Sequence, residues 1–211
     1  MSRILAISDI HGHAEGARKL LHAAGYVPGR DELYLLGDFI DWDSRTWRAL
    51  AYIRQLVAEG ARAVLGNMER WLLDADDEER AGAVSAEELE FLRKTPLYIR
   101  RAPYLFVHAG IRPGVELDRQ EASDLIGIRK DFWGADGHLP FTVVFGHTPT
   151  NKIGAPAGEI WRGPNKLGID TGAKHGCRLT LADLTNRKAY SCSTDDAGLG
   201  LYRDLRQTSW K

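Results

Sequence analysis

The segment ILAISDIHGH, residues 4 to 13, joins a short apolar run to a cluster of polar residues. Ile4 to Ile7 is rich in β-branched and aliphatic side chains and predicts a buried strand. Apolar residues at helical spacing follow from Ala14 to Ala24, and Gly25 predicts the end of that helix. The chain therefore opens with a strand, a polar loop and a helix.

The same order of elements continues beyond this segment. Four more apolar runs predict buried strands, namely Leu33 to Leu36, Ala63 to Leu65, Tyr104 to Val107 and Thr142 to Phe145. A second helix is expected from Trp47 to Val57, with Ser44 as its N-cap and Gly60 after its end. The last third predicts consecutive antiparallel strands over Lys166 to Asp170, Leu179 to Leu184 and Lys188 to Cys192. The fold class is α/β, and we expect a layered α/β sandwich with mixed β-sheets.

Length and composition indicate a globular protein. The chain has 211 residues, of which 44% are hydrophobic and 27% charged, and this excludes a disordered chain. We expect a single domain over residues 1–193 and a polar, loosely docked tail over residues 194–211. The acidic stretch from Asp74 to Glu90 is expected to be a solvated helical excursion, with a helix that begins after Ser85.

The charge balance limits the classes of partner. Lys and Arg number 28 and Asp and Glu number 29, so the net charge of -1 predicts no specific nucleic-acid binding and no attraction to a membrane surface. The first apolar run is too short for a signal-peptide core, and no run approaches the 18 or so apolar residues of a membrane span, so a cytoplasmic protein is expected. Cys177 and Cys192 lack Cys-x-x-Cys spacing and are expected to be reduced thiols.

A polar cluster follows each of the five predicted strands of the first 150 residues. The clusters are SDIHGH (8–13), GDFID (37–41), GNME (66–69), HAG (108–110) and GHTP (146–149). A lone Asp or His after a strand is most often a capping or surface residue. Loops at the carboxyl ends of strands converge on one crevice in open α/β sheets, however, so we expect these clusters to meet and form a site.

Six residues of these clusters are candidate metal ligands: Asp9, His11, Asp38, Asn67, His108 and His147. Mixed imidazole, carboxylate and amide donors suit manganese, and also iron or zinc. Six ligand residues are too many for one open site, and they suit two ions about 3.5 to 4 Å apart with one bridging carboxylate. We therefore expect a dinuclear site at the carboxyl ends of the strands, with a bridging hydroxide as nucleophile for phosphoryl transfer.

The motifs resemble those of the calcineurin-like metallophosphoesterases, within them the small bacterial branch of the phosphoprotein phosphatase type that includes symmetrical diadenosine tetraphosphatase. Asp-x-His-Gly, Gly-Asp-x-x-Asp, Gly-Asn-x-Glu, His-Ala-Gly and Gly-His-Thr-Pro occur in that order, and IDTGA (169–173) is similar to the same branch. The resemblance implies a hydrolase of phosphate esters or phosphoanhydrides. It implies that Asp38 bridges two ions, one also held by Asp9, His11 and His147 and the other by Asn67 and His108.

The same resemblance suggests residues that would handle the substrate. Arg129 lies where this branch has an arginine that binds the phosphoryl group, and a guanidinium fork suits that role. An ordinary exposed arginine on a helix is the alternative. The helices expected between Trp71 and Lys94 would shape the substrate entrance.

Two positions depart from the family pattern. Met68 replaces a histidine that the family pairs with the second Asp of Gly-Asp-x-x-Asp, here Asp41, and that acts on the leaving group. Trp42 replaces a phosphate-binding arginine. Loss of a general acid costs about 100- to 10,000-fold for a leaving group that needs a proton. A phosphate leaving group, with a second pKa of about 6, needs less help, so the departures favour nucleotide polyphosphates over phosphoesters.

Several alternatives remain open at this point. His13 could supply the missing proton, and Arg45 could reach the phosphate or pair with Asp41. Trp42 could stack on a nucleobase or simply pack at the rim of the site. His22, His138 and His175 lie outside any motif and are expected to be surface or packing residues. A serine/threonine protein phosphatase, a phosphodiesterase and a metal- or phosphate-binding protein without turnover are the competing functions, so the substrate could be a phosphorylated small molecule, a nucleotide or a phosphoprotein.

Overall fold

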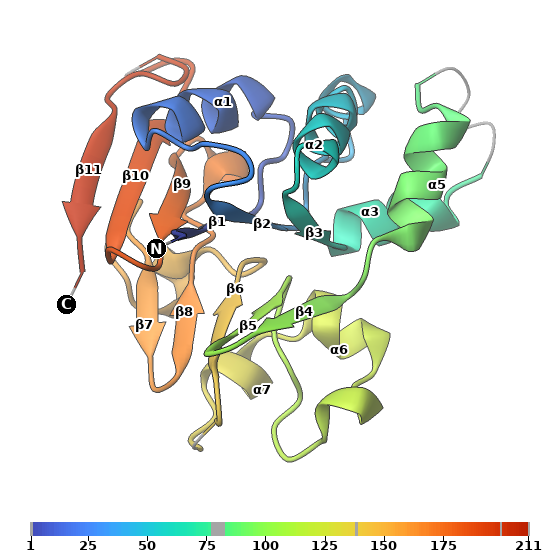
Figure 1. The fold of residues 1–211 in the computed structure, drawn as a ribbon, viewed down its shortest axis with the longest axis vertical. Helices are drawn as coiled ribbons and strands as arrows, with labels where there is room; N and C mark the ends of the chain where they lie inside the picture. The colour runs from blue at the N-terminus through green and yellow to red at the C-terminus, as the bar shows by residue number, and fades with distance from the viewer. Residues whose placement is uncertain (1, 77–82, 138, 199, 211) are drawn as a thin grey trace.

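Two stacked β-sheets form the centre of the molecule, with helices on their outer faces (Figure 1). The computed structural model describes residues 2–76, 83–137, 139–198 and 200–210. The first sheet has the order β11 (Arg206–Ser209), β10 (Lys188–Ser193), β9 (Arg178–Asp183), β1 (Ile4–Ile7), β2 (Glu32–Leu36) and β3 (Arg62–Val64). The second has the order β4 (Tyr98–Arg101), β5 (Tyr104–Val107), β6 (Thr142–Phe145), β8 (Lys166–Gly168) and β7 (Trp161–Gly163). Both sheets are mixed, as expected.

The strand β1 is apolar throughout because both of its faces are buried. Leu5 and Ile7 of β1 belong to the core beneath the helices, whereas Ile4 and Ala6 belong to the core between the sheets. Tyr34 of β2 stacks on Phe106 of β5 across that second core, with ring centroids 3.8 Å apart. The sequence ILAI is therefore an unbroken apolar run and does not alternate apolar with polar residues.

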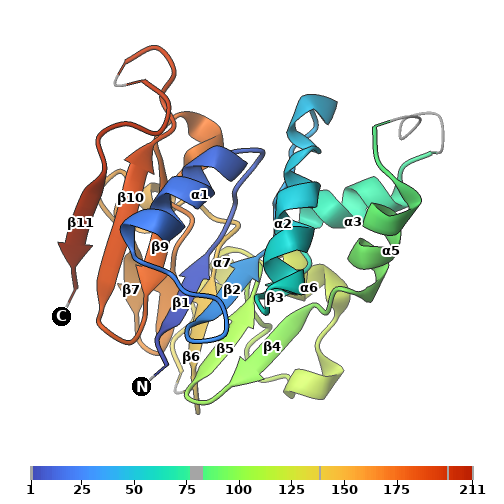
Figure 2. The same ribbon diagram turned by 45° about the horizontal axis from the view of Figure 1, so that its top comes forward.

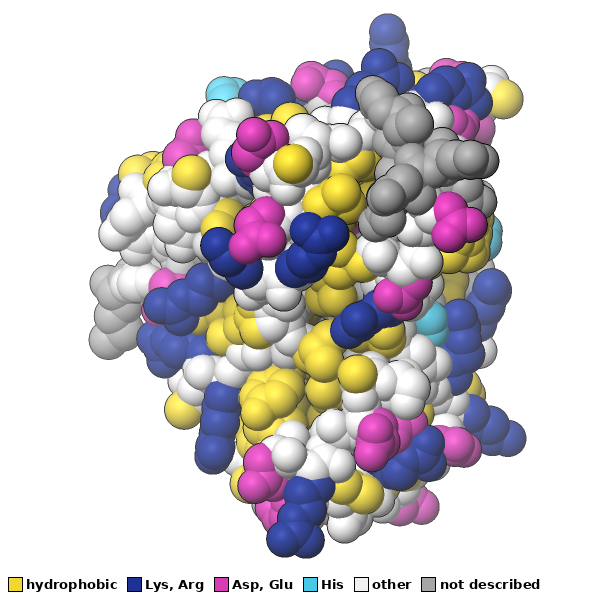
Figure 3. All heavy atoms as spheres, turned by 90° about the vertical axis from the view of Figure 1, so that its right-hand side faces the viewer, with side chains coloured by type: hydrophobic (Ala, Val, Ile, Leu, Met, Phe, Trp, Pro, Cys, Tyr) yellow, Lys and Arg dark blue, Asp and Glu magenta, His cyan; other side chains and the backbone are white. Residues whose placement is uncertain are grey.

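Helices cover the outer face of each sheet. The helices α1 (Ala14–Ala23), α2 (Ala49–Ala58), α3 (Asn67–Asp74) and α5 (Ala86–Lys94) lie beside the first sheet, and α6 (Ala122–Gly127) and α7 (Lys130–Trp133) lie beside the second (Figures 1 and 2). Short 3-10 helices η1 (Ser44–Thr46), η2 (Leu117–Arg119), η3 (Thr150–Ile153) and η4 (Ala173–His175) complete the connections. Figure 3 shows the α5 side of the molecule, where hydrophobic side chains are exposed between charged ones. Within the described ranges, no helix combines the length and apolarity of a membrane span.

Most predicted elements are confirmed within two residues, but the predicted N-cap Ser44 is wrong. The strands β1, β5 and β6 have the predicted bounds. The helix expected from Trp47 begins at Ala49, because Asp43 and not Ser44 accepts the capping hydrogen bond, from the Arg45 N–H, and starts η1 instead. Ser85 is the N-cap of α5, with the expected Glu88 capping box. Part of the acidic excursion, residues 77–82, and His138 lie outside the described residues.

The last third of the chain differs from the expected run of antiparallel strands. β8 does not pair with β9 but runs parallel to β6 in the second sheet, so the chain changes sheets between them. β9 and β10 pair antiparallel as predicted. The expectation of a loosely docked tail is wrong for residues 206–209, which form β11 and pair with β10. The guanidinium of buried Arg178 donates to the Asp204 carboxylate at 2.9 Å and anchors this segment.

Candidate dinuclear metal centre

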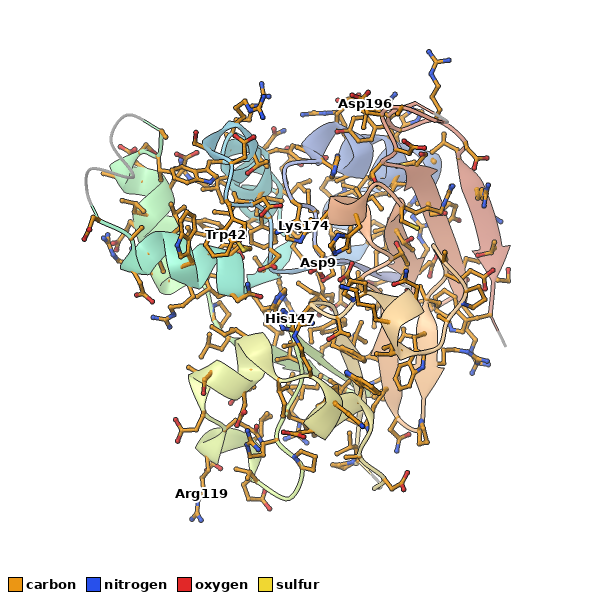
Figure 4. All side chains as sticks on the ribbon, turned by 180° about the vertical axis from the view of Figure 1, so that it is seen from behind. Asp9, Trp42, Arg119, His147, Lys174 and Asp196 are labelled. Carbon is orange, nitrogen blue, oxygen red and sulfur yellow. The ribbon has the colours of Figure 1, made fainter. Side chains whose placement is uncertain are left out.

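The five polar clusters meet, as predicted, at one end of the stacked sheets. A cavity of about 260 Å³ is lined there by Asp9, His11, Asp38, Asn67 and His147. His108 is fully buried behind them, with its Nε2 3.4 Å from Asp38 Oδ1 and 3.1 Å from Asn67 Oδ1. Figure 4 shows Asp9 and His147 close together, with Trp42 and Lys174 beside them. The structure thus brings all six predicted ligand residues to one place.

The loops that carry these residues hold an uncommon backbone conformation. Asp9, His11, Asp38 and His147 have φ values of 52°, 43°, 50° and 64°, in the left-handed region. Such a conformation costs on the order of 1 to 3 kcal/mol for a residue other than glycine, and it persists only where surrounding contacts impose it. Backbone hydrogen bonds supply that constraint, since the Asp9 N–H donates to the Gly37 carbonyl and the His11 N–H to the Asp38 carbonyl. Strain of this kind is typical of a functional site.

The candidate ligand atoms form two groups that share Asp38. Asp9, His11 and Asp38 form one group, and Asp38, His108 and His147 form the other, each with its ligand atoms within 4.8 Å of one another. Asn67 adjoins the second group through His108. This grouping differs from the expected division, which placed His147 with Asp9 and His11. The backbone N–H of His147 does reach Asp9 Oδ2 at 3.0 Å, but its ring lies against His108, with centroids 5.1 Å apart.

The imidazole rings are oriented for metal binding. Backbone carbonyls of Ile40 and Leu36 lie 3.0 and 2.7 Å from the Nδ1 atoms of His11 and His108. A ring N–H that donates to a carbonyl leaves the opposite nitrogen, Nε2, with a lone pair for a metal. Among the described residues, the Nε2 of His147 is buried and has no hydrogen-bond partner. A buried, unpartnered ring nitrogen in one ligand group with the Asp38 carboxylate fits a metal ion.

Glu69 lies behind the candidate ligands and holds the backbone of the loops that carry them. Its buried carboxylate accepts hydrogen bonds from the backbone N–H groups of Asp38, Phe39, Ile40 and Gly66, at 2.7 to 3.3 Å. It therefore joins the loop after β2 to the start of α3. The Met68 N–H also donates to Asp38 Oδ1, at 2.9 Å. Glu69 is the last residue of the motif Gly-Asn-x-Glu, so the motif pointed to it, but the sequence alone did not predict that it holds these loops together.

The substrate side of the cavity contains Trp42, Met68 and Arg129, together with Lys152 and Lys174, which sequence reasoning missed. Trp42 is 57% exposed and packs edge-on against Trp71 of α3. Arg129 is exposed, and its side chain has no hydrogen bond or ion pair within the described part of the chain. The structure places Arg129 and Trp42 where a bound substrate could contact them. Among the described residues of the expected cap-like helices, those of α3 line this cavity and those of α5 do not.

The structure supports neither of the two compensations that the sequence left open. The Nδ1 of His13 lies 3.0 Å from the Tyr202 hydroxyl, and its ring packs edge-on against Tyr202, away from the residues that line the cavity. The Arg45 guanidinium pairs with Asp43, at 2.8 Å between Nε and Oδ2, and does not contact Asp41. Asp41 instead pairs with Lys174, whose Nζ is 2.6 Å from Asp41 Oδ1. His175, expected to be a surface or packing residue, is exposed at the mouth of the cavity.

Comparison with known proteins identifies the family. The profile of the family described as calcineurin-like phosphoesterase matches residues 2–179. The chain belongs to this family. Members are metal-dependent by their description as metallophosphoesterases, in agreement with the two groups of candidate ligands.

The most similar curated relatives carry one name. A symmetrical bis(5'-nucleosyl)-tetraphosphatase of Aromatoleum aromaticum is 31% identical over 124 residues, which are 53% of this chain and 45% of the relative. The protein of the same name from a Janthinobacterium species is 26% identical over 264 residues, covering 86% of this chain and 93% of the relative. Apart from that relative, the match spans about half the length of these curated proteins.

Solved structures support the phosphoesterase fold. The structure of a candidate diadenosine tetraphosphatase superposes with a TM-score of 0.77 at 22% identity and covers 91% of this chain and 93% of its own. A cold-active protein-tyrosine phosphatase of a Shewanella species gives a TM-score of 0.65 at 15% identity over 100% of this chain and 81% of its own. At these identities the likeness establishes the fold.

The electrostatics of this phosphoesterase site reflect closely packed charges. Burial lowers the pKa of His11, but its contact with Asp9 and the charges of the nearby carboxylates outweigh burial and raise that pKa to about 9. Burial, His108 and Arg129 together lower the pKa of His147 to about 3. Burial and the charge of Asp9 raise the pKa of Asp170, another residue of the cavity wall, to about 8. Without metal ions, His11 is therefore protonated at neutral pH, and it must lose that proton to bind a metal.

Proposed function

We propose that this calcineurin-like phosphoesterase hydrolyses phosphoanhydride bonds of nucleotide polyphosphates. The observation that carries the proposal is the pair of ligand groups that share Asp38, with an unpartnered His147 Nε2 facing them. Two ions held there would neutralise charge on the phosphoryl oxygens and activate water. The curated relatives named symmetrical tetraphosphatases support this substrate class.

The proposed metal ligands are the six residues of the two groups. Asp9 and His11 would hold one ion, Asn67, His108 and His147 would hold the other, and Asp38 would bridge them. We propose manganese, with iron or zinc as alternatives, because the donor set mixes imidazole nitrogens with carboxylate and amide oxygens. The cytoplasmic location remains a prediction from the sequence.

Arg129 is the proposed phosphoryl-binding residue. Its guanidinium has no intramolecular partner within the described residues, lies at the cavity and is close enough to His147 to lower the pKa of that imidazole. A free, planar guanidinium can donate two parallel hydrogen bonds to phosphate oxygens. Arg129 would thus orient the phosphorus for attack by water.

The absence of a proton donor at position 68 favours anhydride substrates. Met68 is 2% exposed and lines the cavity, so a thioether occupies the position where a histidine would act on the leaving group. His13 does not compensate, because it faces Tyr202. A phosphate leaving group with a pKa of about 6 departs without a proton, whereas an alkoxide does not. Exposed Trp42 offers a surface on which a nucleobase could stack.

A substrate panel in added Mn²⁺ tests the proposal. Dinucleoside tetraphosphate, an aryl phosphate, an aryl phosphodiester and a phosphopeptide are compared by kcat/KM. We expect the tetraphosphate to be preferred, and Asp38→Asn to abolish both turnover and stoichiometric metal binding. Asp118→Asn, at an exposed residue of η2, is the control and should change neither. A preference for the phosphopeptide would overturn the proposal in favour of a protein phosphatase, and a preference for the diester in favour of a phosphodiesterase.

A metal- or phosphate-binding protein without turnover is the second candidate, favoured by Met68 and Trp42. Met68→His separates the two. Strong phosphomonoesterase activity gained from an inactive parent would support a degenerate site. A parent that already turns over anhydrides efficiently would exclude it.

A further inference from the structure

The cavity separates negative charge at its floor from positive charge at its rim. Its three acidic residues, Asp9, Asp38 and Asp170, are at most 5% exposed. Its three permanent cations, Arg129, Lys152 and Lys174, are all exposed. A floor of this kind attracts metal cations, and a rim of this kind attracts anions. Three cations are more than the single phosphoryl group of a monoester requires.

Lys174 is fixed in position by a short loop and an ion pair. It lies in η4, between Gly172 and Gly176, whose φ values of 87° and 66° make the turn tight. Its ammonium donates to Asp41 Oδ1 at 2.6 Å, and the same oxygen accepts the Trp42 N–H at 2.7 Å. An ammonium has three donors, so two remain for a ligand in the cavity. The Lys174 side chain is 33% exposed and lines the cavity.

The rim cations lie at different ends of the site. Lys174 is paired with Asp41, whose Oδ2 is 3.9 Å from His11 Nδ1, and so lies beside the group of Asp9 and His11. Arg129 lines the cavity together with His147, a residue of the other group, and lowers the pKa of that imidazole. Lys152, in η3, lines the same cavity. A phosphoryl group held by Arg129 leaves Lys174 and Lys152 for a second anionic group of the same substrate.

We propose that Lys174 and Lys152 form a subsite for the leaving phosphate of a polyphosphate substrate, with Asp41 positioning Lys174. This inference rests on the proposed function. Water adds to the phosphorus, the bond from phosphorus to the bridging oxygen breaks, and its electron pair stays on the leaving phosphate. Both protons of the water pass to solvent at neutral pH, because each new terminal phosphate has a second pKa of about 6. Lys174 transfers no proton and stabilises the charge that develops on the leaving oxygen.

The subsite explains how the site functions without a histidine at position 68. A fixed ammonium stabilises a leaving phosphate through charge, and it gives much less help to a neutral alcohol that needs a proton. Lys174 would therefore act as a determinant of specificity for anionic leaving groups.

Calorimetric binding of ADP and AMP to the Mn²⁺-loaded protein tests the subsite. The two ligands share a base and a ribose, so any stacking on Trp42 cancels in the comparison. Removal of a charged hydrogen-bond donor is expected to weaken binding by about tenfold or more. Lys174→Met should raise the Kd for ADP by that factor and change the Kd for AMP less than about threefold, and Lys174→Arg should restore most of the ADP affinity. Metal content and thermal melting confirm that each variant is loaded and folded.

Lys94→Met is the matched control. Lys94 forms an ion pair with Glu90 at 3.1 Å on α5, outside the cavity. Lys94→Met therefore removes one positive charge and one ion pair, as Lys174→Met does. It should leave both affinities unchanged. Equal losses for ADP and AMP in Lys174→Met, or no loss for either, would overturn the subsite. Failure of the wild type to hydrolyse tetraphosphate, with Lys174-dependent ADP binding intact, would instead overturn the proposed function.

Discussion

Glu69 shows how one side chain can hold a site that it does not line. Its carboxylate accepts four backbone N–H groups from the two loops that present Asp38 and Asn67. Burial and the nearby Asp38 raise its pKa to about 7, and the N–H groups oppose that rise. Glu69 is a positioning residue, because it acts on the candidate bridging ligand through the backbone.

Glu69→Gln tests this role. An amide retains one acceptor oxygen and directs an NH₂ group at backbone donors, so we expect a loss of unfolding free energy of about 1 to 3 kcal/mol. Metal affinity should fall as well, because Asp38 is less constrained. Urea denaturation and metal titration measure both effects. Glu88→Gln, in the exposed capping box of α5, is the control, and an equal loss there would show that Glu69 has no special role.

Among the elements, the loop after β6 approaches the loop after β1 most closely at Gly146. A Cβ atom at Gly146 would collide with Ser8 Oγ and Asp9 Oδ2. The Ser8 hydroxyl donates to that same Asp9 oxygen, and so does the His147 N–H. The motif Gly-His-Thr-Pro therefore requires glycine for close contact between two ligand loops.

Gly146→Ala should move Asp9 away from His147. We expect at least a tenfold loss of metal affinity, because disturbing a group that orients a metal ligand typically costs 10- to 100-fold. We also expect a lower Tm. Gly127→Ala in α6 is the comparison, since no atom lies within 4 Å of its added Cβ. Isothermal titration with Mn²⁺ measures the affinity, and a Gly146→Ala protein that binds metal like the wild type would contradict the close packing.

For the whole molecule, the site depends on two sheets stacked so that loops from both meet. β1, β2 and β3 of the first sheet supply Asp9, His11, Asp38 and Asn67, and β5 and β6 of the second supply His108 and His147. Each sheet alone would carry only part of a site. Folding of the interlayer core and assembly of the metal centre are therefore coupled.

This coupling predicts how the stability of the metal-free protein varies with pH. The raised pKa of His11, about 9, contributes stability that is present below its ordinary value of 6.5 and lost as pH rises through 9. Asp170 and Glu69, raised to about 8 and 7, hold protons more tightly when folded, so their deprotonation also lowers stability as pH rises. The pKa of His147 is lowered to about 3 and that of Asp9 to about 2. In the folded protein His147 is therefore already neutral and Asp9 already ionised at pH 6.5, and these two groups leave the trend unchanged.

After chelation we therefore expect the Tm to fall between pH 6.5 and 9. One pKa unit corresponds to about 1.4 kcal/mol, and a loss of that order lowers the Tm of a chain this long by about 3 to 6 °C. Differential scanning calorimetry with and without Mn²⁺ measures the change. The Mn²⁺-loaded protein should show a smaller fall, because bound ions replace the protons. A Tm that rises over this range without metal would contradict the assigned pKa directions.

The sequence by itself determined the strands β1, β5 and β6, the helix ends at Gly25 and Gly60, and the six residues that meet at the cavity. Those features depend on local periodicity, on turn residues and on motifs a few residues long. Only the tertiary structure decided that β8 joins the second sheet, that β11 completes the first, that His147 groups with His108, and that Lys174 rather than Arg45 or His13 approaches the site. Asp41 and Lys174 are 133 residues apart, and contacts at that separation depend on how the layers pack and where side chains point, which no local pattern encodes.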